Sequence, residues 1–591
     1  MNISPSQNRL TASYPVGLNR RLSAVFIFIL IGAALIVIRL FILMVLQHNL
    51  YVALAANSQE FFSQLSPERG SIYLQDSRSG EEYPAAINRD FFIVFADTRE
   101  IKDDKTAENV AIKLTEVFAY SAEDKLELYY KLNKRDDPYE PIEQKVDEEV
   151  MERIQALALP GIGFVRRPER YYPENNLAAQ VLGFYGQTDD GQGVGRYGVE
   201  GFWNRELVGS GGFLSGERSA AGRIVSFVGG AFKPPENGAD ILLSIDRTLQ
   251  FKACERLRQG LVDYKASGAS LIIMDPMSGA IRAMCGLPDF NPNTYNEVSS
   301  VSIYNNSAIF TPYEPGSVFK PIIMAAALNE GVVRAETEFF DTGSVEAGCK
   351  KPIKNAGNKT YEKQSMVGVL ENSINTGMVY VAEKLGRRKL VDYVEAFGFG
   401  IKEGLELDSE APGNIESLYK NENKEFDCYT ATASFGQGIS ATPIQLVTAF
   451  GVLANGGSLI KPYIVEEVRY ADGRVEKAKP KEIRKVIDKK TASIIGGMLV
   501  NVVDNGHAKA ARVKGYYVAG KTGTAQIAGP GGYTEDTNHS FVGYAPIDDP
   551  RFVMIIKFEK PAAVYSESTA VPVFGDIAEF ALQYYQVPPA R

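Results

Sequence analysis

A long apolar run near the N-terminus limits what this chain can be. Residues 22–38 are uncharged and almost wholly apolar, and after Arg39 the apolar sequence continues to Leu46. A helix of this length spans a hydrocarbon core of about 30 Å. An uncleaved transmembrane anchor is therefore predicted for residues 22–46. The alternative is a cleaved signal peptide, but the apolar core of a signal peptide is usually only about 7–15 residues long.

Positive charge flanks this run mainly on its N-terminal side. Arg20 and Arg21 precede it, whereas no lysine or arginine lies between Arg39 and Arg69. The positive-inside rule predicts that residues 1–21 are a cytoplasmic tail and that the bulk of the chain is extracytoplasmic, as in a periplasmic domain on a plasma (inner) membrane anchor. Arg39 is expected to reach the outer interface or, alternatively, to pair with a partner membrane helix.

Composition narrows the chemistry that is available. The net charge of −9 makes the chain a poor candidate for a nucleic-acid binder. Only three histidines occur, so a histidine-rich metal site is nearly excluded and no metal is expected. The four cysteines form no C-x-x-C pair and are expected to be separate, mostly buried thiols, with one disulfide left open. They are Cys254, Cys285, Cys349 and Cys428.

Two parts follow the anchor, with a boundary near residue 236. Residues 47–235 mix strand-like and charged helical pieces, which predicts an α+β pedestal domain with a linker or β-rich connection at 208–240. Residues 236–591 carry strand-like pieces at both ends and helices between, which predicts one α+β domain with a sheet built from both ends. In the pedestal we expect strands at Phe91–Phe95, Ile162–Val165 and Val181–Phe184 and helices at about 104–118, 122–134 and 147–157.

Two glycine-rich stretches match nucleotide-binding patterns literally. Residues 515–522 read GYYVAGKT, but a phosphate loop needs a flexible loop between a strand and a helix. Here the middle of the motif favours a strand, and GTAQIAGPGG after it cannot start a helix. Residues 193–198, GVGRYG, follow no apolar strand and are interpreted as a turn region. No nucleotide is expected.

The first motif with chemical meaning is Ser317-Val-Phe-Lys320. Pro315 and Gly316 precede it, and a helical pattern continues to Gly331. Serine and lysine three residues apart share one helix face, so the amine can take the hydroxyl proton. Lysine has an ordinary pKa of about 10.4, so burial or a nearby cation must lower it for this role. Taken alone, the pattern is more often a helix-capping serine with a surface lysine.

The second motif is Ser373-Ile374-Asn375, which precedes the apolar helical segment MVYVAEKL. Ser373 could relay a proton, and Asn375 could bind a substrate amide. Taken alone, this motif is a polar helix cap.

The third motif, Lys521-Thr522-Gly523-Thr524, ends a strand-like segment. Gly523 would let a substrate approach the backbone closely, and the two threonine hydroxyls suit a carboxylate. Lys521 would add positive charge beside Lys320 and lower its pKa. Taken alone, the motif is a solvent-exposed strand end.

The conjunction S-x-x-K, S-x-N, K-T-G in this order is the constellation of β-lactamases and penicillin-binding proteins. With it, the chain resembles a class B penicillin-binding protein, a peptidoglycan D,D-transpeptidase. The similarity covers nearly the whole chain. It is carried by DPMSGAIRAM, PDFNPN, YEPGSVFKP, SFGQGISATPIQL, VAGKTGTAQ and FVGYAPIDDPR in the second half, and by RGSIYL, RYYP and GVEGFWNREL in the pedestal. The segments NTGMVYVAEKLG and SFGQGISATPIQL resemble the division-specific branch more than the elongation branch, whereas residues 75–78 are spaced differently from the family's pedestal motif.

This resemblance implies a fold and a mechanism. It implies one N-terminal transmembrane helix, an α+β pedestal of the dimerisation type, and an α+β transpeptidase domain whose antiparallel sheet is flanked by helices. Ser317 would attack the D-alanyl-D-alanine bond of a stem peptide, Lys320 would accept its proton, and Ser373 would return a proton to the departing D-alanine. The backbone N–H groups of Ser317 and Thr524 would form the oxyanion hole.

The resemblance also implies how substrates and partners bind. Asn375 and residues 521–524 would hold the donor peptide, with Thr522 and Thr524 on its carboxylate. Peptidoglycan stem peptides are the expected substrates, β-lactams the covalent inhibitors, and a membrane glycosyltransferase with other division proteins the partners. No cofactor is implied, and neither His507 nor His539 is expected to be required.

Other functions stay open from sequence. They are an elongation-type transpeptidase, a D,D-carboxypeptidase, a β-lactamase and a catalytically silent division scaffold.

Overall fold

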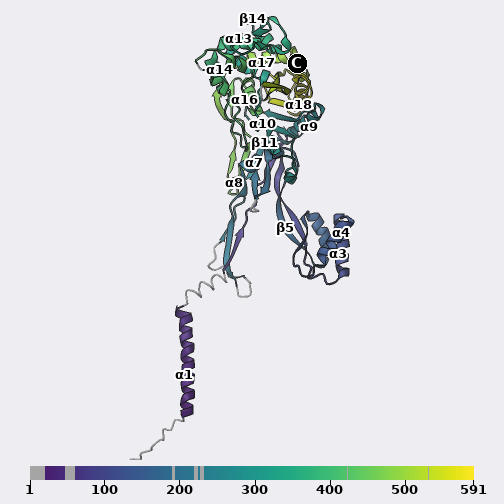
Figure 1. Cartoon of the computed structure of the whole chain (residues 1–591), viewed down its shortest axis with the longest axis vertical. Coiled ribbons are helices and arrows are strands. Elements are labelled where there is room, and N and C mark those ends of the chain that lie inside the picture. The colour runs from purple at the N-terminus through teal and green to yellow at the C-terminus, as the bar shows by residue number, and fades with distance from the viewer. Residues whose placement is uncertain are drawn as a thin grey trace, which may run out of the picture. The chain divides into compact units, whose positions relative to one another are not determined.

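The computed structural model describes residues 20–46, 60–188, 193–218, 224–226, 232–421, 423–529 and 532–590. The chain divides into two compact units, each made of two segments (Figure 1). The first draws on residues 1–66 and 211–235, and the second on residues 67–210 and 236–591. The second unit holds every residue of the three motifs.

The first unit contains the apolar helix. Helix α1 (Arg20–Phe41) runs into the π-helical turn η1 (Ile42–Leu46). Its segment Ala24–Phe41 has a mean hydropathy of 2.8, and within the described ranges it is the one helix long and apolar enough to cross a membrane. The prediction of a single N-terminal spanning helix is confirmed.

A small antiparallel sheet completes the first unit. Strand β1 (Glu60–Leu65) pairs with β8 (Gly212–Arg218), which also pairs with β9 (Ile224–Ser226) and β10 (Phe232–Lys233). The described part of the Gly- and Ser-rich stretch is therefore a β-rich connection.

A seven-stranded sheet forms the base of the second unit, in the order β20-β19-β11-β2-β3-β4 with β5 on β3. Its strands are β2 (Ile72–Gln75), β3 (Glu82–Ala96), β4 (Glu140–Val146), β5 (Ile162–Tyr171), β11 (Asp240–Asp246), β19 (Val465–Arg469) and β20 (Val475–Lys477). Strands β2 and β11 pair in parallel. The sheet thus joins pedestal residues to strands that follow residue 236.

The pedestal helices match the charged pieces expected from sequence. Helices α3 (Asp104–Phe118), α4 (Ala122–Leu132) and α5 (Glu148–Ala156) bury their apolar faces against β3 to β5 in a core of their own. The strand expected at Val181–Phe184 is wrong for most of its length. Residues Ala179–Leu182 form the short helix α6, and strand β6 (Phe184–Gln187) begins after Gly183, whose φ of 77° turns the chain.

A buried ion cluster links the segments of the pedestal. Arg170 donates to a Glu200 carboxylate oxygen at 2.7 Å, and Arg69 bonds the other oxygen of the same carboxylate. Burial raises the pKa of Glu200, but the two guanidinium groups outweigh it and hold the pKa below its ordinary value. Glu200 therefore stays charged inside the pedestal, because both partners are buried with it.

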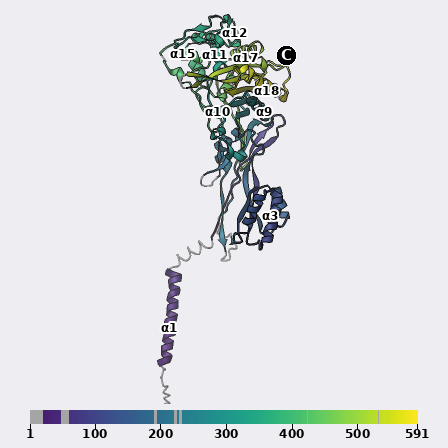
Figure 2. The same cartoon turned by 45° about the vertical axis from the view of Figure 1, so that its right-hand side comes forward.

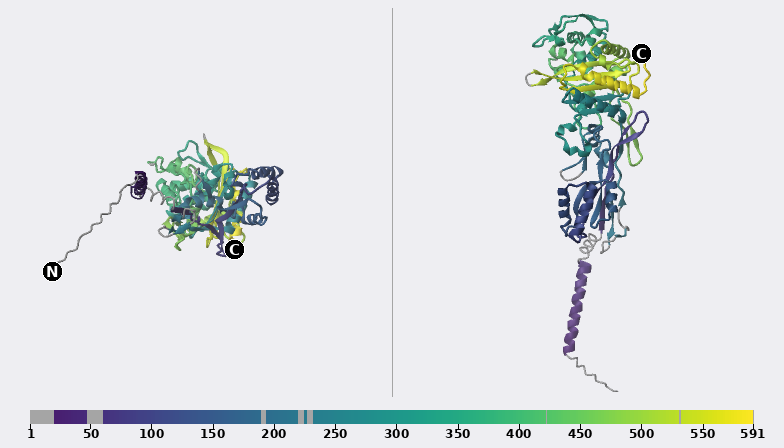
Figure 3. Two further views of the ribbon diagram at one scale, coloured as in Figure 1. Left: turned by 90° about the horizontal axis from the view of Figure 1, so that it is seen from below. Right: turned by 90° about the vertical axis from the view of Figure 1, so that its right-hand side faces the viewer.

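The second sheet is antiparallel and has the order β13-β12-β24-β23-β22. Its strands are β12 (Gly268–Met274), β13 (Ile281–Leu287), β22 (Ala519–Gly529), β23 (Gly532–Ala545) and β24 (Phe552–Glu559). Strands from the two ends of the domain meet where β12 pairs with β24, as Figure 3 shows for the yellow C-terminal strands. The predicted sheet of terminal strands is confirmed. The phosphate-loop pattern is divided: residues 515–518 precede β22 and residues 519–522 begin it, so the strand expected in the middle of the motif is wrong except at Ala519. The pattern continues into the strand and not into a helix.

Helices cover both faces of this sheet (Figure 2). Helices α9 (Arg247–Asp263) and α18 (Ala570–Tyr584) pack on one face, and α16 (Pro443–Ala454) and α17 (Lys489–Asp504) on the other. The short helix α10 (Ser307–Phe310) also contacts β12 and β13. The remaining helices of the domain are α11 (Lys320–Asn329), α12 (Met366–Glu371), α13 (Asn375–Leu385), α14 (Arg387–Ala396) and α15 (Cys428–Ala433). Their buried residues form one continuous core with the sheet.

All four cysteines are paired, which corrects the expectation of separate thiols. Cys254 on α9 bonds Cys285 on β13, and Cys349 bonds Cys428 at the start of α15. The partners are 31 and 79 residues apart, so only the packing of the folded chain brings them together. Two disulfides agree with the expected extracytoplasmic location of this domain.

Candidate active site

The predicted site residues meet around one cavity of about 290 Å³ between the second sheet and the helices beside it. Ser317, Ser373, Asn375, Thr522 and Thr524 all line it. The other described residues of its wall are Gly316, Asn355, Ala356, Gly357, Lys359, Tyr361, Asn372, Phe435, Gln437, His507, Ala525, Tyr565, Ser566 and Glu567. Lys320, Lys521 and Gly523 lie behind this wall.

The first motif forms a tight turn before its helix. Gly316 to Phe319 make the 3-10 turn η4, and α11 begins at Lys320 with Pro321 in its first turn, as expected. Gly316 has a φ of 57°, which favours glycine because it lies in the left-handed region. The turn presents Ser317 to the cavity and buries Lys320 completely.

The second motif sets the position of the Lys320 amine. Its Nζ atom lies 2.8 Å from Asn375 Oδ1 and 3.2 Å from the Ser373 hydroxyl, and it also donates to the Ser373 carbonyl at 2.5 Å. Ser373 has a φ of 57°, a strained value for a residue other than glycine. Helix α13 begins at Asn375, so the strained residue joins α12 to α13 at the site itself.

The third motif brings a second buried amine to the same hydroxyl. Lys521 on β22 donates to Ser373 Oγ at 3.0 Å and to Thr522 Oγ1 at 3.2 Å. Burial lowers the pKa of Lys521 to about 7. Burial, and secondly the charge of Lys521, hold the pKa of Lys320 well below its ordinary value. The expected effect of Lys521 on Lys320 is therefore present.

Gly523 is needed for packing between β22 and the turn before α11. A Cβ atom at this position would meet the Ser540 hydroxyl at 2.6 Å and the Pro315 carbonyl oxygen at 3.0 Å. The structure thus gives a reason for glycine here besides the expected approach of substrate. The close packing at Gly523 keeps Thr522 and Thr524 of β22 near the turn that carries Ser317.

A buried aspartate supports the second motif, and sequence reasoning missed it. Asp341, at the end of β14 (Glu338–Asp341), accepts hydrogen bonds from the Thr376 hydroxyl at 2.6 Å and from Asn355 Nδ2 and the Tyr361 N–H at 2.8 Å each. Burial raises the pKa of Asp341, but these bonds outweigh it and the pKa lies below its ordinary value. Asp341 therefore ties the cavity wall at 355–361 to the first turn of α13.

Glu314, just before the first motif, was also missed as a site residue. It accepts hydrogen bonds from the Gly438 N–H at 2.9 Å and from the Tyr533 hydroxyl at 2.8 Å. Burial raises the pKa of its carboxyl group. Glu314 thereby joins the segment before the first motif to the loop at Gly438 and to the start of β23.

His539 is a buried residue that contacts two threonine hydroxyls and does not line the cavity. It lies within β23, opposite Thr524 on β22. It is fully buried, and its ring nitrogens lie 3.0 Å from the hydroxyls of Thr537 and Thr569. Burial lowers its pKa to about 4, so the ring is neutral near pH 7.

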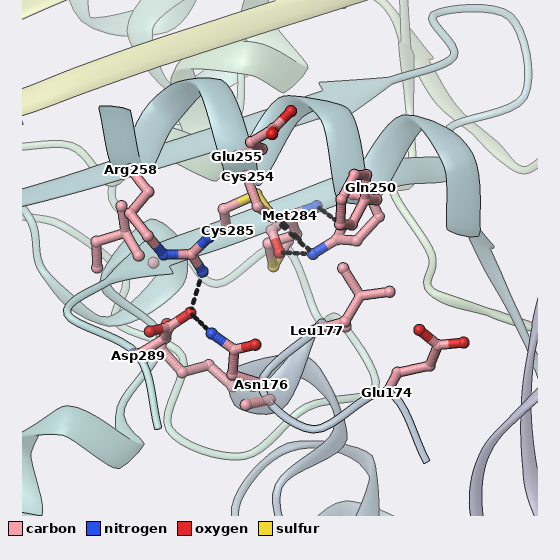
Figure 4. Close-up of a pocket in the computed structure, with 16 residues that line it drawn as sticks. Glu174, Asn176, Leu177, Gln250, Cys254, Glu255, Arg258, Met284, Cys285 and Asp289 are labelled. Atoms are coloured by element: carbon pink, nitrogen blue, oxygen red, sulfur yellow. Dashed lines mark hydrogen bonds and ion pairs between the residues drawn. A yellow bond between two sulfur atoms is a disulfide. The ribbon is translucent and has the colours of Figure 1, made fainter. Parts of the chain in front are cut away.

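A second cavity, of about 300 Å³, lies below α9 and has a different character (Figure 4). Arg258 from α9 donates to Asp289 at 2.7 Å, and Asn176 from the pedestal reaches the same carboxylate oxygen at 3.1 Å. The described residues that line this cavity include no serine, threonine, lysine or histidine, and its two cysteines form a disulfide. Its described lining therefore offers no hydroxyl, amine or free thiol as a nucleophile, and its polar groups hold pedestal and transpeptidase segments together.

Fold and site together define a serine-type transpeptidase of the penicillin-binding class. Residues 269–579 match the Penicillin binding protein transpeptidase domain, and residues 64–243 match the Penicillin-binding Protein dimerisation domain. The chain belongs to the penicillin-binding proteins and, because it combines these two domains, to their class B.

Curated relatives agree with this membership. The chain is 33% identical to Stage V sporulation protein D of Bacillus subtilis over 586 residues, which covers 98% of this chain and 87% of the relative. It is 29% identical to Peptidoglycan D,D-transpeptidase FtsI of Escherichia coli over 451 residues, which covers 76% of this chain and 72% of the relative.

Solved structures share the fold. Penicillin Binding Protein 2X of Streptococcus thermophilus superposes with a TM-score of 0.73 at 22% identity, covering 88% of this chain and 80% of that one. Penicillin binding protein 3 of Mycobacterium tuberculosis, solved in complex with aztreonam, gives a TM-score of 0.67 at 23% identity, covering 90% and 98%.

Proposed function

We propose that this protein forms peptide cross-links in peptidoglycan through an acyl-enzyme on Ser317. The observation that carries the proposal is the Ser373 hydroxyl, which two buried lysine amines share beside the cavity that Ser317 lines. Such an arrangement supplies a base and a proton relay without histidine.

Acylation begins with the hydroxyl of Ser317. Its oxygen attacks the carbonyl carbon of the penultimate D-alanine while its proton passes to the neutral amine of Lys320. Burial and the charge of Lys521 lower the pKa of Lys320 and so favour its neutral form. The backbone N–H groups of Ser317 and Thr524 stabilise the negative oxygen that develops.

Collapse of this intermediate releases D-alanine and leaves an ester on Ser317. The C–N bond breaks, Ser373 donates its proton to the departing nitrogen, and Lys320 returns a proton to Ser373. Lys521, Thr522 and Thr524 hold the carboxylate of the donor, and Asn375 holds its peptide amide. An amine of a second stem peptide then attacks the ester, forms the cross-link and restores the Ser317 hydroxyl.

β-Lactams fit the same site as acylating inhibitors. The ring carbonyl takes the place of the D-alanyl carbonyl, and the opened ring stays attached to Ser317. The likeness to a protein solved with aztreonam supports this proposal.

Location and partners follow from the anchor and the relatives. Helix α1 would place a short tail in the cytoplasm and the catalytic domain outside the plasma membrane. The relative FtsI, together with the segments NTGMVYVAEKLG and SFGQGISATPIQL, supports a role at the division septum, with a membrane glycosyltransferase and other division proteins as partners. The greater identity to Stage V sporulation protein D favours sporulation as a second setting for the same chemistry. Imaging a tagged copy at the septum, along the side wall or in a forming spore separates these roles.

A fluorescent penicillin tests the chemistry. Wild-type protein should carry one covalent label, and Ser317→Ala should carry none while its unfolding temperature is unchanged. Covalent label that persists in Ser317→Ala would overturn the assignment.

Product analysis with a donor peptide and an amine separates transfer from the hydrolysis of a D,D-carboxypeptidase, and rapid turnover of penicillin would indicate a β-lactamase. Division supported by Ser317→Ala would indicate a scaffold.

A further inference from the structure

One carboxylate stands in an active-site cavity whose other acid–base side chains are basic. Among the described residues that line it, the ionisable groups with acidic or basic side chains are Lys359, His507 and Glu567. Lys320 and Lys521 lie directly behind the wall. The positive charge suits a donor peptide that ends in a carboxylate, whereas the single carboxylate of Glu567 suits a ligand of the opposite charge.

Glu567 is held in place from two sides. Its neighbour Ser566, in the short turn η8 (Ser566–Ser568), donates its backbone N–H to the Thr524 hydroxyl at 3.1 Å. On the other side, His507 Nδ1 lies 3.3 Å from a Glu567 carboxylate oxygen. The backbone of η8 is therefore tied to the strand that carries the third motif, and His507 orients the carboxylate.

Solvent still reaches this pair. The side chains of His507 and Glu567 are 45% and 44% exposed. A carboxylate that is half-exposed, positioned by a neighbour and open to a cavity can bind a cation from solution at little desolvation cost. Lys320 and Lys521 carry amines, so they do not attract a cationic acceptor.

We propose that Glu567, positioned by His507, is an entry subsite that recognises the ammonium group of the acceptor in transpeptidation. This inference rests on the proposed function, because only a transpeptidase takes an amine as its second substrate. An acceptor amine is protonated in solution near neutral pH, so it arrives as a cation. The carboxylate draws that cation to the end of the cavity where Thr524 lies.

The amine must lose one proton before it attacks. As it leaves Glu567 for the ester, the proton passes through the Ser373 hydroxyl to Lys320, which is neutral at that stage, and Lys320 releases it to solvent before the next acylation. The nitrogen then bonds to the acyl carbon, the bond between that carbon and Ser317 Oγ breaks, and the second amine proton lost by the nitrogen returns to Ser317 Oγ. The subsite thus favours an amine over water without taking part in bond formation.

The test compares a charged acceptor with an uncharged one. Full-length protein is given an acyl-D-alanyl thioester donor and either Nα-acetyl-lysine amide, whose only charge is its ammonium group, or hydroxylamine, which is largely uncharged near neutral pH. The measured quantity is the ratio of transfer product to hydrolysis product. Both products arise from one acyl-enzyme, so the ratio does not depend on the acylation rate.

Glu567→Gln should lower this ratio about three- to fivefold for the lysine amide and leave it unchanged for hydroxylamine. Glu567→Lys should lower it further, and high salt should shrink the effect. Glu535→Gln, which removes an exposed carboxylate that does not line the cavity, is the matched control and should leave both ratios unchanged.

Two results would overturn the proposal while leaving the proposed function intact. One is an unchanged ratio for the lysine amide in Glu567→Gln. The other is an equal fall with both acceptors, which would mean that Glu567 shapes the cavity instead of recognising charge. Wild-type protein that forms an acyl-enzyme but yields hydrolysis product with every acceptor would overturn the transpeptidase function and the subsite together.

Discussion

The amine of Lys521 lies 3.0 Å from the hydroxyl oxygen of Ser373, a residue 148 positions earlier in the chain. Lys320 lies 3.2 Å from the same oxygen. Two buried amines in a low-dielectric environment repel each other strongly when both are charged. The loss of a proton from one amine therefore stabilises the charge on the other. The shared hydroxyl is the natural path for that proton.

Removal of this hydroxyl should slow the chemistry more than it affects stability. Ser373→Ala leaves both amines without their common partner, and we expect acylation by a fluorescent penicillin to slow by about 10²–10⁴-fold. Ser299→Ala, on an exposed loop, is the control and should acylate at the wild-type rate. Acylation of Ser373→Ala within twofold of wild type would exclude the relay.

The two lysines should give acylation a bell-shaped pH profile. On the acidic side the rate rises with pH as Lys320 loses its proton and becomes a base. On the alkaline side the rate falls as Lys521, whose pKa is lowered to about 7, loses the charge that binds the donor carboxylate. Lys521→Arg should retain its charge and move the alkaline limb upward by at least two pH units. If wild type and Lys521→Arg lose acylation activity over the same alkaline pH range, a group other than Lys521 causes the loss.

The packing of Gly523 predicts a strong effect of a single methyl group. Gly523→Ala would force β22 away from Ser540 and Pro315, and we expect acylation to fall at least tenfold. Gly497 on α17 has nothing within 4 Å of an added Cβ, so Gly497→Ala should keep full activity and raise stability by about 0.5–1 kcal/mol. Equal acylation rates for the two variants would contradict the packing argument.

Asp341 should link stability to the geometry of the second motif. Asp341→Asn puts an N–H group where donors already point, which should cost about 1–3 kcal/mol in denaturant unfolding and also slow acylation. Asp549→Asn, on an exposed turn, should change the unfolding free energy by less than about 0.5 kcal/mol. A stable Asp341→Asn protein with normal acylation would show that the hydrogen bonds around Asp341 are dispensable.

The buried ion cluster of the pedestal predicts a larger loss. Glu200→Gln leaves Arg69 and Arg170 buried without a countercharge, and we expect the unfolding free energy to fall by about 3–5 kcal/mol. Glu149→Gln, on helix α5 in the same domain, should have little effect. Calorimetry on the full chain measures both, and equal stability of the two variants would refute the structural role.

The sequence predicted much of this fold because its patterns are local. The helix at 104–118 was found with its bounds, since its charged helical pattern lies within one segment. The strand expected at Val181–Phe184 was wrong because short apolar runs fit a helix and a strand equally well. The cysteine pairs were missed because they depend on packing between distant segments.

The site residues also fall into two groups, those in local motifs and those placed by packing between distant segments. Ser317, Lys320 and Ser373 belong to short motifs, so spacing and order were enough to identify them. Asp341 and Glu567 lie in no motif, and their place at the cavity arises only when β14 and η8 fold against the helices and strands that hold the motifs. For Asp341, the sequence signal is the tripeptide Asp341-Thr-Gly, in which an aspartate stands two residues before a glycine.

The sheet that joins β2 to β11 has a consequence for genetic exchange. Recombination between related genes at codon 236 would unite a β2 from one parent with β11 and β19 from another, although these strands form one hydrogen-bonded ladder. Hybrids that inherit residues 72–75, 240–246 and 465–469 from the same parent keep that ladder intact. Viable mosaics should therefore take all three segments from one parent, whatever selective pressure favours a new active site.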